Sequence, residues 1–217
     1  MKALILAAGR GRRLWPYTVD RPKCLLHLDG ASILDHQLQQ LERIPVSEVV
    51  LICGFGIDKV RAAVSAYSGH LCIKTLYNPF YAVSDNLISL WTARAEMDDD
   101  LLLLNGDGVF HPGIFQCLAA TEEACCLMIA RKFAYDTDDM KVAIRQNHIV
   151  QIGKDLAPEE TDAESIGAMR FSGEGVHRLR QALAEIVIHF RTGGPQRDQV
   201  VAHGVKWIVQ GLYAEMS

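Results

Sequence analysis

The sequence predicts an α/β fold: a doubly wound, mostly parallel sheet in a single domain, with an irregular C-terminal half. Three observations support this prediction. Short apolar runs alternate with amphipathic segments through residue 130, which is typical of strands joined by helices. A glycine-rich loop follows the first apolar run directly. After Arg131 the alternation gives way to hairpin-like and polar segments.

The elements of the first 130 residues are predicted from their hydrophobic periods. Compact apolar runs are expected to be buried strands: Ala3–Leu6, Val49–Cys53, Cys72–Tyr77, Leu101–Asn105 and Cys125–Ala130. Segments with apolar residues at helical spacing are expected to be helices: Ile33–Leu41, Ile57–Tyr67, Asn86–Met97 and Pro112–Ala120. Ser84 or Asp85 is available as the N-cap of the helix that begins at Asn86.

The remaining residues predict a hairpin, a strand, a helix and a last strand after a chain break. In order these are Lys141–Arg145 with His148–Ile152, a strand near Ile166–Phe171, the helix Glu174–Phe190, and Val205–Val209 after Gly193-Gly194-Pro195. The turn of the hairpin is expected at Gln146-Asn147. No interdomain linker separates this half from the first, so we expect one domain over residues 1–217.

Length and composition exclude several function classes. A chain of 217 residues is long enough for one full core. Its net charge of −4 lacks the basic footprint of a general nucleic-acid binder, so no nucleic-acid partner is expected. Six cysteines without C-x-x-C spacing predict reduced core thiols in a cytoplasmic protein. No segment is apolar enough to span a membrane, and because the sequence starts directly with an expected core strand, no signal peptide is expected.

The loop after the first strand predicts a polyphosphate site. It reads Leu6-Ala7-Ala8-Gly9-Arg10-Gly11-Arg12-Arg13-Leu14 and is followed by Pro22-Lys23. A strand that ends in small residues leaves backbone N–H groups free to point at an anion, and Arg13 and Lys23 add positive charge. The alternative is an ordinary strand–helix turn with surface arginines.

Two other glycine-rich loops do not fit this segment. Leu14 stands where the dinucleotide fingerprint has its third glycine, which close helix–strand packing requires. No Gly-Lys-Ser/Thr run is present, so the loop is not a P-loop.

A second candidate site lies at Gly106-Asp107, directly after the strand Leu101–Asn105. In open α/β sheets, ligands bind outside the carboxyl ends of the strands. A carboxylate there suits Mg²⁺, which proteins hold through one or two carboxylates plus substrate phosphates. A plain turn aspartate is the alternative, since Gly106-Asp107-Gly108 is good turn chemistry. Together with the N-terminal loop, the pattern favours the metal site.

The loop, the Pro22-Lys23 pair and Gly106-Asp107 resemble the nucleotidyltransferases that activate sugar phosphates and alcohol phosphates, including MobA-like NTP transferases. Asn78-Pro79-Phe80-Tyr81, with Ser84-Asp85-Asn86, is similar to a subgroup that uses CTP to activate phosphocholine, aminoethylphosphonate and related compounds. The resemblance implies a Rossmann-like sheet of the nucleotide-diphospho-sugar transferase type. It implies a nucleotide-binding half at residues 1–130 and an acceptor-binding half at residues 131–217. Mg²⁺ would be the cofactor, and CTP or another NTP and a small phospho- or phosphono-acceptor the substrates.

The resemblance also gives each candidate residue a role. Arg13 and Lys23 are expected to be catalytic, neutralising the leaving phosphates and the transferred phosphoryl group. Asp107 and Glu215 are expected to bind the metal. The expected nucleotide contacts are Leu6, Ala7, Ala8, Gly9, Arg10, Gly11, Arg12, Gly54, Ser84, Asn86 and Gly106. The expected acceptor contacts are Tyr81, Lys141, Glu164 and Asp198.

Two alternatives remain open at the level of sequence. A sugar-1-phosphate nucleotidyltransferase using UTP, GTP or dTTP would need a longer sugar-binding region than the roughly 90 residues that follow Ala130. A non-catalytic nucleotide-binding module is suggested by Ser217, which stands where relatives have an acidic metal ligand. Impaired metal binding, a shortened chain and a diverged specificity are further explanations of Ser217. A homodimer is compatible with the sequence.

Overall fold

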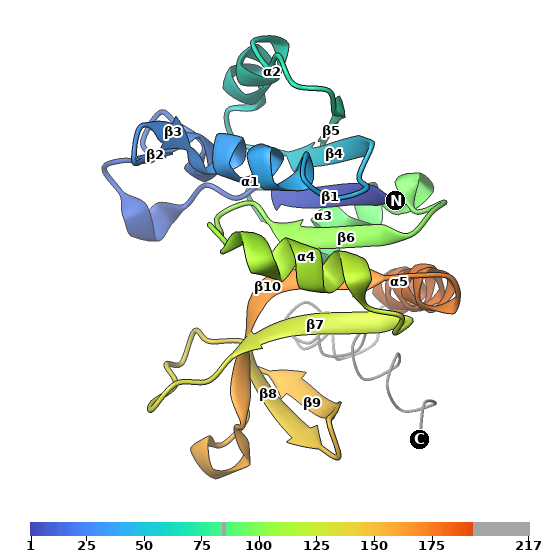
Figure 1. Ribbon diagram of the computed structural model, residues 1–217. Helices are drawn as coiled ribbons and strands as arrows, with labels where there is room; N and C mark the ends of the chain where they lie inside the picture. The colour runs from blue at the N-terminus through green and yellow to red at the C-terminus, as the bar shows by residue number, and fades with distance from the viewer. Residues whose placement is uncertain (84–85, 193–217) are drawn as a thin grey trace.

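The computed structural model describes residues 1–83 and 86–192. Its centre is an eight-stranded sheet in the order β5-β4-β1-β6-β10-β8-β9, with β7 also paired to β10 (Figure 1). The strands are β1 (Lys2–Ala7), β4 (Glu48–Cys53), β5 (Cys72–Tyr77), β6 (Leu101–Asn105), β7 (Cys125–Ala130), β8 (Lys141–Arg145), β9 (His148–Gly153) and β10 (Ala163–Phe171). β5, β4, β1 and β6 are mutually parallel, and β10 runs antiparallel to β6. The predicted mostly parallel α/β sheet is therefore confirmed.

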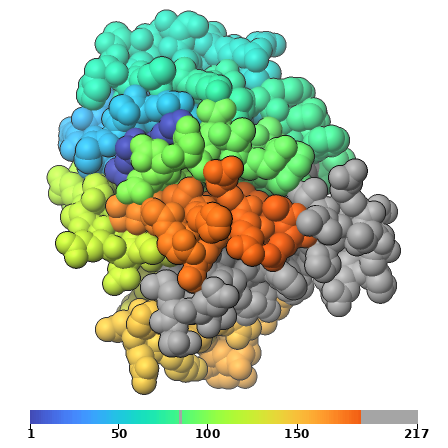
Figure 2. Space-filling view, turned by 90° about the vertical axis from the view of Figure 1, so that its right-hand side faces the viewer, coloured from blue at the N-terminus to red at the C-terminus, as the bar shows by residue number. Residues whose placement is uncertain are grey.

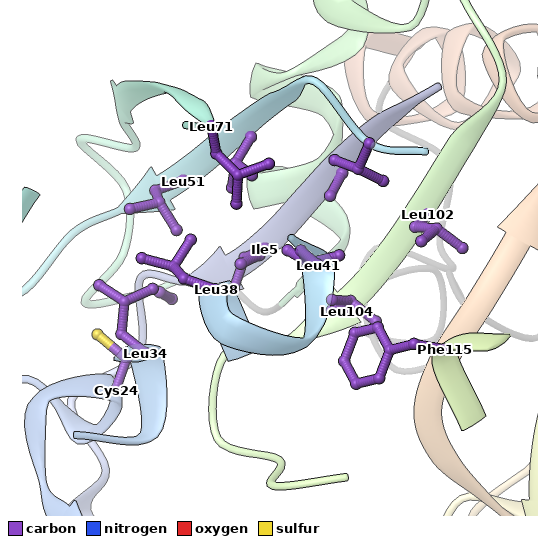
Figure 3. Close-up of a cluster of buried hydrophobic side chains, with 14 of the residues drawn as sticks. Ile5, Cys24, Leu34, Leu38, Leu41, Leu51, Leu71, Leu102, Leu104 and Phe115 are labelled. Carbon is purple, nitrogen blue, oxygen red and sulfur yellow. The ribbon is translucent and has the colours of Figure 1, made fainter. Parts of the chain in front are cut away.

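Helices cover both faces of the parallel strands, as expected for a doubly wound fold. They are α1 (Ile33–Leu41), α2 (Ile57–Ser65), α3 (Asn86–Thr92), α4 (Pro112–Ala120) and α5 (Glu174–Thr192). Side chains of β1 alternate between the two faces: Ile5 packs with α1 and α4, whereas Leu4 packs with α3 and α5. Figure 3 shows the first of these cores, where Leu38 and Leu41 of α1 and Phe115 of α4 pack against one face of the sheet.

The β8–β9 hairpin and the α2–β5 segment lie at opposite ends of the molecule (Figures 1 and 2). The hairpin was predicted, and its turn residues Gln146 and Asn147 both have positive φ, at 50° and 65°. That conformation matches the right-handed twist of the flanking strands. Between the two ends, the carboxyl edges of β1 and β6 lie side by side, because these strands are parallel neighbours.

The third predicted helix is shorter than expected. The sequence predicted Asn86–Met97, but α3 ends at Thr92 and a 3-10 turn follows at Arg94–Glu96. Thr92 Oγ1 donates to the Ile88 carbonyl at 2.8 Å, and the Ala93 N–H is shared between the carbonyls of Ser89 and Leu90. Both contacts tighten the chain and end the α-helix. Hydrophobic spacing does not reveal such local hydrogen bonds, so the sequence predicted a longer helix.

Other boundaries differ by a few residues. α2 ends at Ser65 instead of Tyr67, and α5 reaches Thr192 instead of Phe190. β10 begins at Ala163, three residues before the expected strand near Ile166–Phe171. The predicted break Gly193-Gly194-Pro195 and strand Val205–Val209 lie outside the described residues.

One hairpin was not predicted. β2 (His27–Leu28) and β3 (Ala31–Ser32) pair around Asp29 and Gly30, whose φ values are 50° and 88°. The hairpin leads directly into α1, where Ser32 and Asp35 form a capping box. This cap fixes the start of the helix whose buried face supports the site.

No disulfide joins the six cysteines, all of which lie among the described residues. Cys24, Cys53 and Cys125 are buried, whereas Cys72 and Cys117 are exposed, so the predicted core placement was wrong for these two. Across residues 1–83 and 86–192, the structure contains no helix that is both long and apolar enough to cross a membrane.

Candidate active site

The glycine loop after β1 folds back tightly on residues further along the chain. Gly11 has a φ of 62°, a left-handed conformation that favours glycine. A Cβ at this position would lie 3.1 Å from Thr18 Cγ2 and 3.3 Å from Lys23 Cβ. The buried Thr18 hydroxyl donates to the Gly11 carbonyl at 2.9 Å. This packing brings the Pro22-Lys23 segment beside the loop, as the sequence predicted.

A pocket of about 280 Å³ opens where the loop meets the carboxyl ends of β1 and β6. It is lined by Leu6, Ala7, Gly9, Gly11, Arg12, Arg13, Leu14, Lys23, Cys24, Asn86, Asn105, Gly106 and Asp107. Most of these residues were predicted. Leu14, Cys24 and Asn105 were given no role, although Asn105 ends the strand that precedes Gly106-Asp107 and could have been found by its position.

Lys23 and Asp107 meet directly in this pocket. Lys23 Nζ donates to Asp107 Oδ2 at 2.5 Å, and the two side chains are 28% and 44% exposed. A cation and a carboxylate that share a partly open pocket can each exchange this contact for a ligand, the lysine for a phosphate oxygen and the carboxylate for a metal ion.

Gly106 allows Asp107 to approach the first strand closely. Its N–H donates to the Leu6 carbonyl at 3.0 Å. A Cβ on Gly106 would lie 2.8 Å from that carbonyl oxygen and 2.9 Å from Ala7 Cα, closer than real Cβ atoms come. Glycine is therefore required here, because the turn that carries the candidate metal ligand Asp107 packs directly against β1.

Arg13 reaches across the pocket mouth to the segment after β7. Its guanidinium donates to Asp138 Oδ2 at 2.7 Å, and Lys154 Nζ lies 3.2 Å from the other Asp138 oxygen. The hydrogen bond from Lys154, and then the charge of Arg13, lower the pKa of Asp138. Arg13 remains 78% exposed, so its guanidinium is accessible to an incoming anion.

A second group of predicted nucleotide residues lies beside the pocket lining. The Arg10 guanidinium sits 5.4 Å from the centre of the Phe55 ring and 6.0 Å from that of Tyr81, within cation–π range. The Phe55 N–H donates to the Ala8 carbonyl at 3.2 Å. A Cβ on Gly54 would lie 2.6 Å from that same carbonyl oxygen, so the loop after β4 packs closely on the glycine loop.

Two of the predicted acceptor residues are engaged within the protein. Lys141 is only 6% exposed, and its Nζ donates to the Lys154 carbonyl at 2.7 Å. It lies at the start of β8, which pairs with both β9 and β10. Glu164 forms a 2.7 Å ion pair with Lys132. Their acceptor roles stay predictions.

A second, smaller cavity of about 90 Å³ adjoins the first. The two cavities share Leu6, Asn86 and Asn105. The smaller cavity is lined mainly by apolar side chains, and also by Met140 and Ser165, which are the sequence neighbours of the predicted acceptor residues. Three predicted residues, Ser84, Asp198 and Glu215, lie outside the described residues.

Asp107 fits a magnesium ion only as a single carboxylate ligand. In the described part of the chain, no three His, Cys, Asp or Glu side chains gather as a metal site. A lone, partly exposed carboxylate in a pocket lined by backbone and cationic groups nevertheless suits Mg²⁺, because this ion commonly takes one or two protein carboxylates and completes its shell with phosphate oxygens and water.

The segment that carries the glycine loop, Lys23 and Asp107 matches the sequence model of a known family. The MobA-like NTP transferase domain matches residues 3–161, a span that includes all three. The chain belongs to this family. The family is described as NTP transferases, so nucleotidyl transfer is the activity expected of the chain.

Curated relatives in this family differ in length and specificity. The chain is 37% identical over 131 residues to the CMP-5'-(3-aminopropyl)phosphonate synthase of Streptomyces rubellomurinus, covering 60% of this chain and 21% of the relative. It is 27% identical over 189 residues to the CTP:phosphoglutamine cytidylyltransferase of Campylobacter jejuni, covering 79% and 73%. A bifunctional GlmU protein of Methanococcus maripaludis is 31% identical over 187 residues, with 86% and 42% covered. The chain thus spans only about a fifth of the Streptomyces relative's length.

Solved structures confirm the fold. A CTP:phosphocholine cytidylyltransferase from Streptococcus pneumoniae superposes with a TM-score of 0.66 at 18% identity, covering 94% of this chain and 85% of that one. A UDP-glucose pyrophosphorylase gives a TM-score of 0.72 at 13% identity, with 94% and 85% covered. At such identities the likeness concerns the fold alone.

Proposed function

We propose that this nucleotidyltransferase is a Mg²⁺-dependent cytidylyltransferase that joins CMP from CTP to a small phosphate or phosphonate acceptor and releases pyrophosphate. The observation that carries the proposal is the 2.5 Å contact of Lys23 with Asp107 in a pocket walled by the glycine loop. It supports the proposal because phosphoryl-type transfer needs a cation for the phosphates and a carboxylate for the metal ion close together.

The reaction needs little covalent chemistry from the protein. An oxygen of the acceptor's phosphate or phosphonate attacks the α-phosphorus of CTP in line with the leaving group. The new bond joins that oxygen to the α-phosphorus, the bond from the α-phosphorus to the bridging oxygen breaks, and pyrophosphate leaves with the electron pair. The acceptor oxygen is already ionised near neutral pH, so no general base is required. The protein contributes positioning and charge stabilisation.

Different residues of the pocket position the substrates and stabilise the charge. Backbone N–H groups of the loop from Ala8 to Gly11 hold the triphosphate. Lys23 stabilises the charge that develops on the α-phosphoryl group, and Arg13 leaves Asp138 to neutralise the departing phosphates. Asp107 would hold Mg²⁺, with Glu215 as the proposed second ligand. The ion, when bound, supplies Lewis-acid charge neutralisation to the phosphate oxygens.

CTP is the preferred nucleotide for two reasons. The segment from Asn78 to Trp91 is similar to the CTP-using subgroup, and both the Streptomyces and the Campylobacter relatives are named for CMP or CTP chemistry.

The second cavity beside Asn86 and Asn105 has room for a small acceptor group next to the proposed phosphate site.

A sugar-1-phosphate nucleotidyltransferase is the second candidate function. It is favoured by the relatives in that class, such as the UTP–glucose-1-phosphate uridylyltransferase AglF of Haloferax volcanii, which is 30% identical over 122 residues and covers 52% of this chain.

A substrate panel separates the two candidates. The full chain is incubated with Mg²⁺, one of CTP, UTP, GTP or dTTP, and one of phosphocholine, aminoethylphosphonate or glucose 1-phosphate, and products are identified by mass spectrometry. A CMP adduct of a small phosphate or phosphonate, formed from CTP in preference to the other nucleotides, supports the proposal. A UDP-sugar or dTDP-sugar product would instead establish the second candidate.

A further inference from the structure

The turn that carries Asp107 is weakly closed by its own backbone. Asn105, Gly106, Asp107 and Gly108 form the four positions of this turn after β6. The hydrogen bond expected across it, from the Gly108 N–H to the Asn105 carbonyl, measures 3.4 Å between donor and acceptor. That distance is long for an N–H···O bond, which is usually 2.7–3.2 Å. The turn is therefore held only loosely by its own backbone hydrogen bond.

Gln37 supports this turn from the buried face of α1. Its Nε2 donates to the Asn105 carbonyl at 2.8 Å and to the Gly108 carbonyl at 2.7 Å. Each hydrogen of the amide thus holds one end of the turn, and Asp107 lies between the two ends. The side chain is 1% exposed, so water does not compete for these bonds.

The orientation of the Gln37 amide is fixed by its partners. Flipping the amide would place Oε1 against two carbonyl oxygens, which accept but cannot donate hydrogen bonds. In the present orientation Oε1 is buried and has no partner among the described residues. The side chain thus donates hydrogen bonds to two carbonyls of the turn, although its own acceptor stays unpaired. The hydrogen bonds of the amide therefore serve the turn and not the helix that carries Gln37.

The helix holds Gln37 rigidly in place. α1 begins at the Ser32–Asp35 capping box, and its buried residues Leu34, Leu38 and Leu41 pack in the core under β1 and β6. A second contact fixes the turn from the other side, where the Gly106 N–H donates to Leu6 at 3.0 Å. The turn is thus held at its middle by β1 and at both ends by Gln37.

We propose that Gln37 is a positioning residue for the nucleotidyl transfer: it holds the turn 105–108 so that the Asp107 carboxylate stays at Lys23 and in place for the metal ion. This inference rests on the proposed function, because it assigns Asp107 to metal binding. Gln37 itself does not line either of the two cavities at the site.

The first test replaces the amide with an apolar side chain of similar length, Gln37→Met. Removing groups that orient metal ligands commonly costs 10- to 100-fold in metal affinity or activity. We expect the Mg²⁺ concentration for half-maximal pyrophosphate release to rise at least about 10-fold. A direct readout, Mn²⁺ binding followed by electron paramagnetic resonance in the presence of CTP and no acceptor, should weaken in parallel.

Gln40→Met is the matched control. Gln40 lies on the same helix and is partly buried, with its Oε1 buried and unpaired among the described residues, but no described bond joins its side chain to the turn 105–108. A loss of helix stability would affect both variants. A loss of metal affinity confined to Gln37→Met supports the positioning role.

A second variant keeps the inference testable if Gln37→Met folds poorly. In Gln37→Glu the introduced side chain has the same shape but no donor while it is ionised, and one donor once it is protonated. Its activity relative to the unmodified chain should therefore rise as the pH falls. A purely structural role would change thermal unfolding without this change in the pH profile.

The outcomes separate the inference from the proposed function. If the unmodified chain binds Mn²⁺ in an Asp107-dependent way and Gln37→Met and Gln37→Glu bind it equally well at every pH, Gln37 is not a positioning residue, although the proposed function stands. If the unmodified chain shows neither Asp107-dependent Mn²⁺ binding nor pyrophosphate release, both the function and the inference are overturned.

Discussion

Lys23 and Asp107 are 84 residues apart in sequence, yet Lys23 Nζ lies 2.5 Å from Asp107 Oδ2. Two neighbouring parallel strands create this contact: β1 delivers the loop that leads to Lys23, and β6 delivers Asp107 at the same edge of the sheet. The contact joins the proposed phosphate-binding side of the pocket to its proposed metal-binding side. The first prediction concerns this pair.

Replacing Lys23 with Met should reduce catalysis far more than stability. Removing one preorganised charge from a site of transition-state stabilisation typically lowers kcat by about 10²–10³-fold. The Lys23–Asp107 pair is partly exposed, and such pairs contribute at most about 1 kcal/mol to folding. Steady-state kinetics and thermal unfolding of Lys23→Met check both parts. A large fall in melting temperature with unchanged kcat would show that the pair serves the fold.

Two glycines of the site should respond in opposite ways to alanine. A Cβ on Gly106 would lie 2.8 Å from the Leu6 carbonyl oxygen, so Gly106→Ala should destabilise the fold by about 1–3 kcal/mol. A Cβ on Gly9 would meet nothing within 4 Å, so Gly9→Ala should fold normally. The methyl group added at position 9 would instead stand at the proposed phosphate site and raise the KM for CTP. Urea unfolding and kinetics distinguish the two variants, and equal stability losses would contradict the packing described here.

The Arg13–Asp138 pair should compete with nucleotide binding. The pKa of Asp138 lies below its ordinary value of 3.8, because of Lys154 and Arg13, so the pair is intact at neutral pH and is lost only as the pH falls through that lowered pKa. Asp138→Asn frees Arg13 and should lower the KM for CTP, by up to about five-fold for an exposed pair.

A double-mutant cycle checks the origin of that effect. In an Arg13→Gln background, Asp138→Asn should leave the KM for CTP unchanged. An equal decrease in both backgrounds would mean that Asp138 acts through bulk charge and not through Arg13.

Thiol reactivity should follow burial. Burial raises the pKa of Cys24 and Cys53 to about 12 and that of Cys125 to about 11, so these thiols stay protonated at pH 8. Iodoacetamide should therefore label the exposed Cys72 and Cys117 first, as peptide mass spectrometry can show. Early labelling of Cys24, which lines the pocket, would indicate that the loop opens.

The sequence was most informative where local pattern and fold agree. The apolar run of β6 followed by Gly106-Asp107, and the loop from Gly9 to Leu14, predicted one shared site because parallel strands end at a common edge. Asp29-Gly30 carried an equally clear hairpin signal, and the β2–β3 hairpin was predictable from it.

Contacts between distant segments could not be predicted from pattern. Lys141 is buried, and its bond to the Lys154 carbonyl forms because β8 pairs with β9 and brings Lys141 opposite Gly153. Gln37 was not predicted to have any role, since a glutamine among leucines gives no sign that its amide reaches residues 105 and 108. Such roles depend on which loops the tertiary fold brings together.

The most direct test of the central claim is pyrophosphate release from CTP in the presence of Mg²⁺ and a small phosphate or phosphonate acceptor, comparing the unmodified chain with Asp107→Ala. The account predicts acceptor-dependent release that Asp107→Ala reduces by at least about 10²-fold while the variant remains folded by circular dichroism. Equal release by the two proteins would contradict the claim that the Lys23–Asp107 pocket performs the transfer.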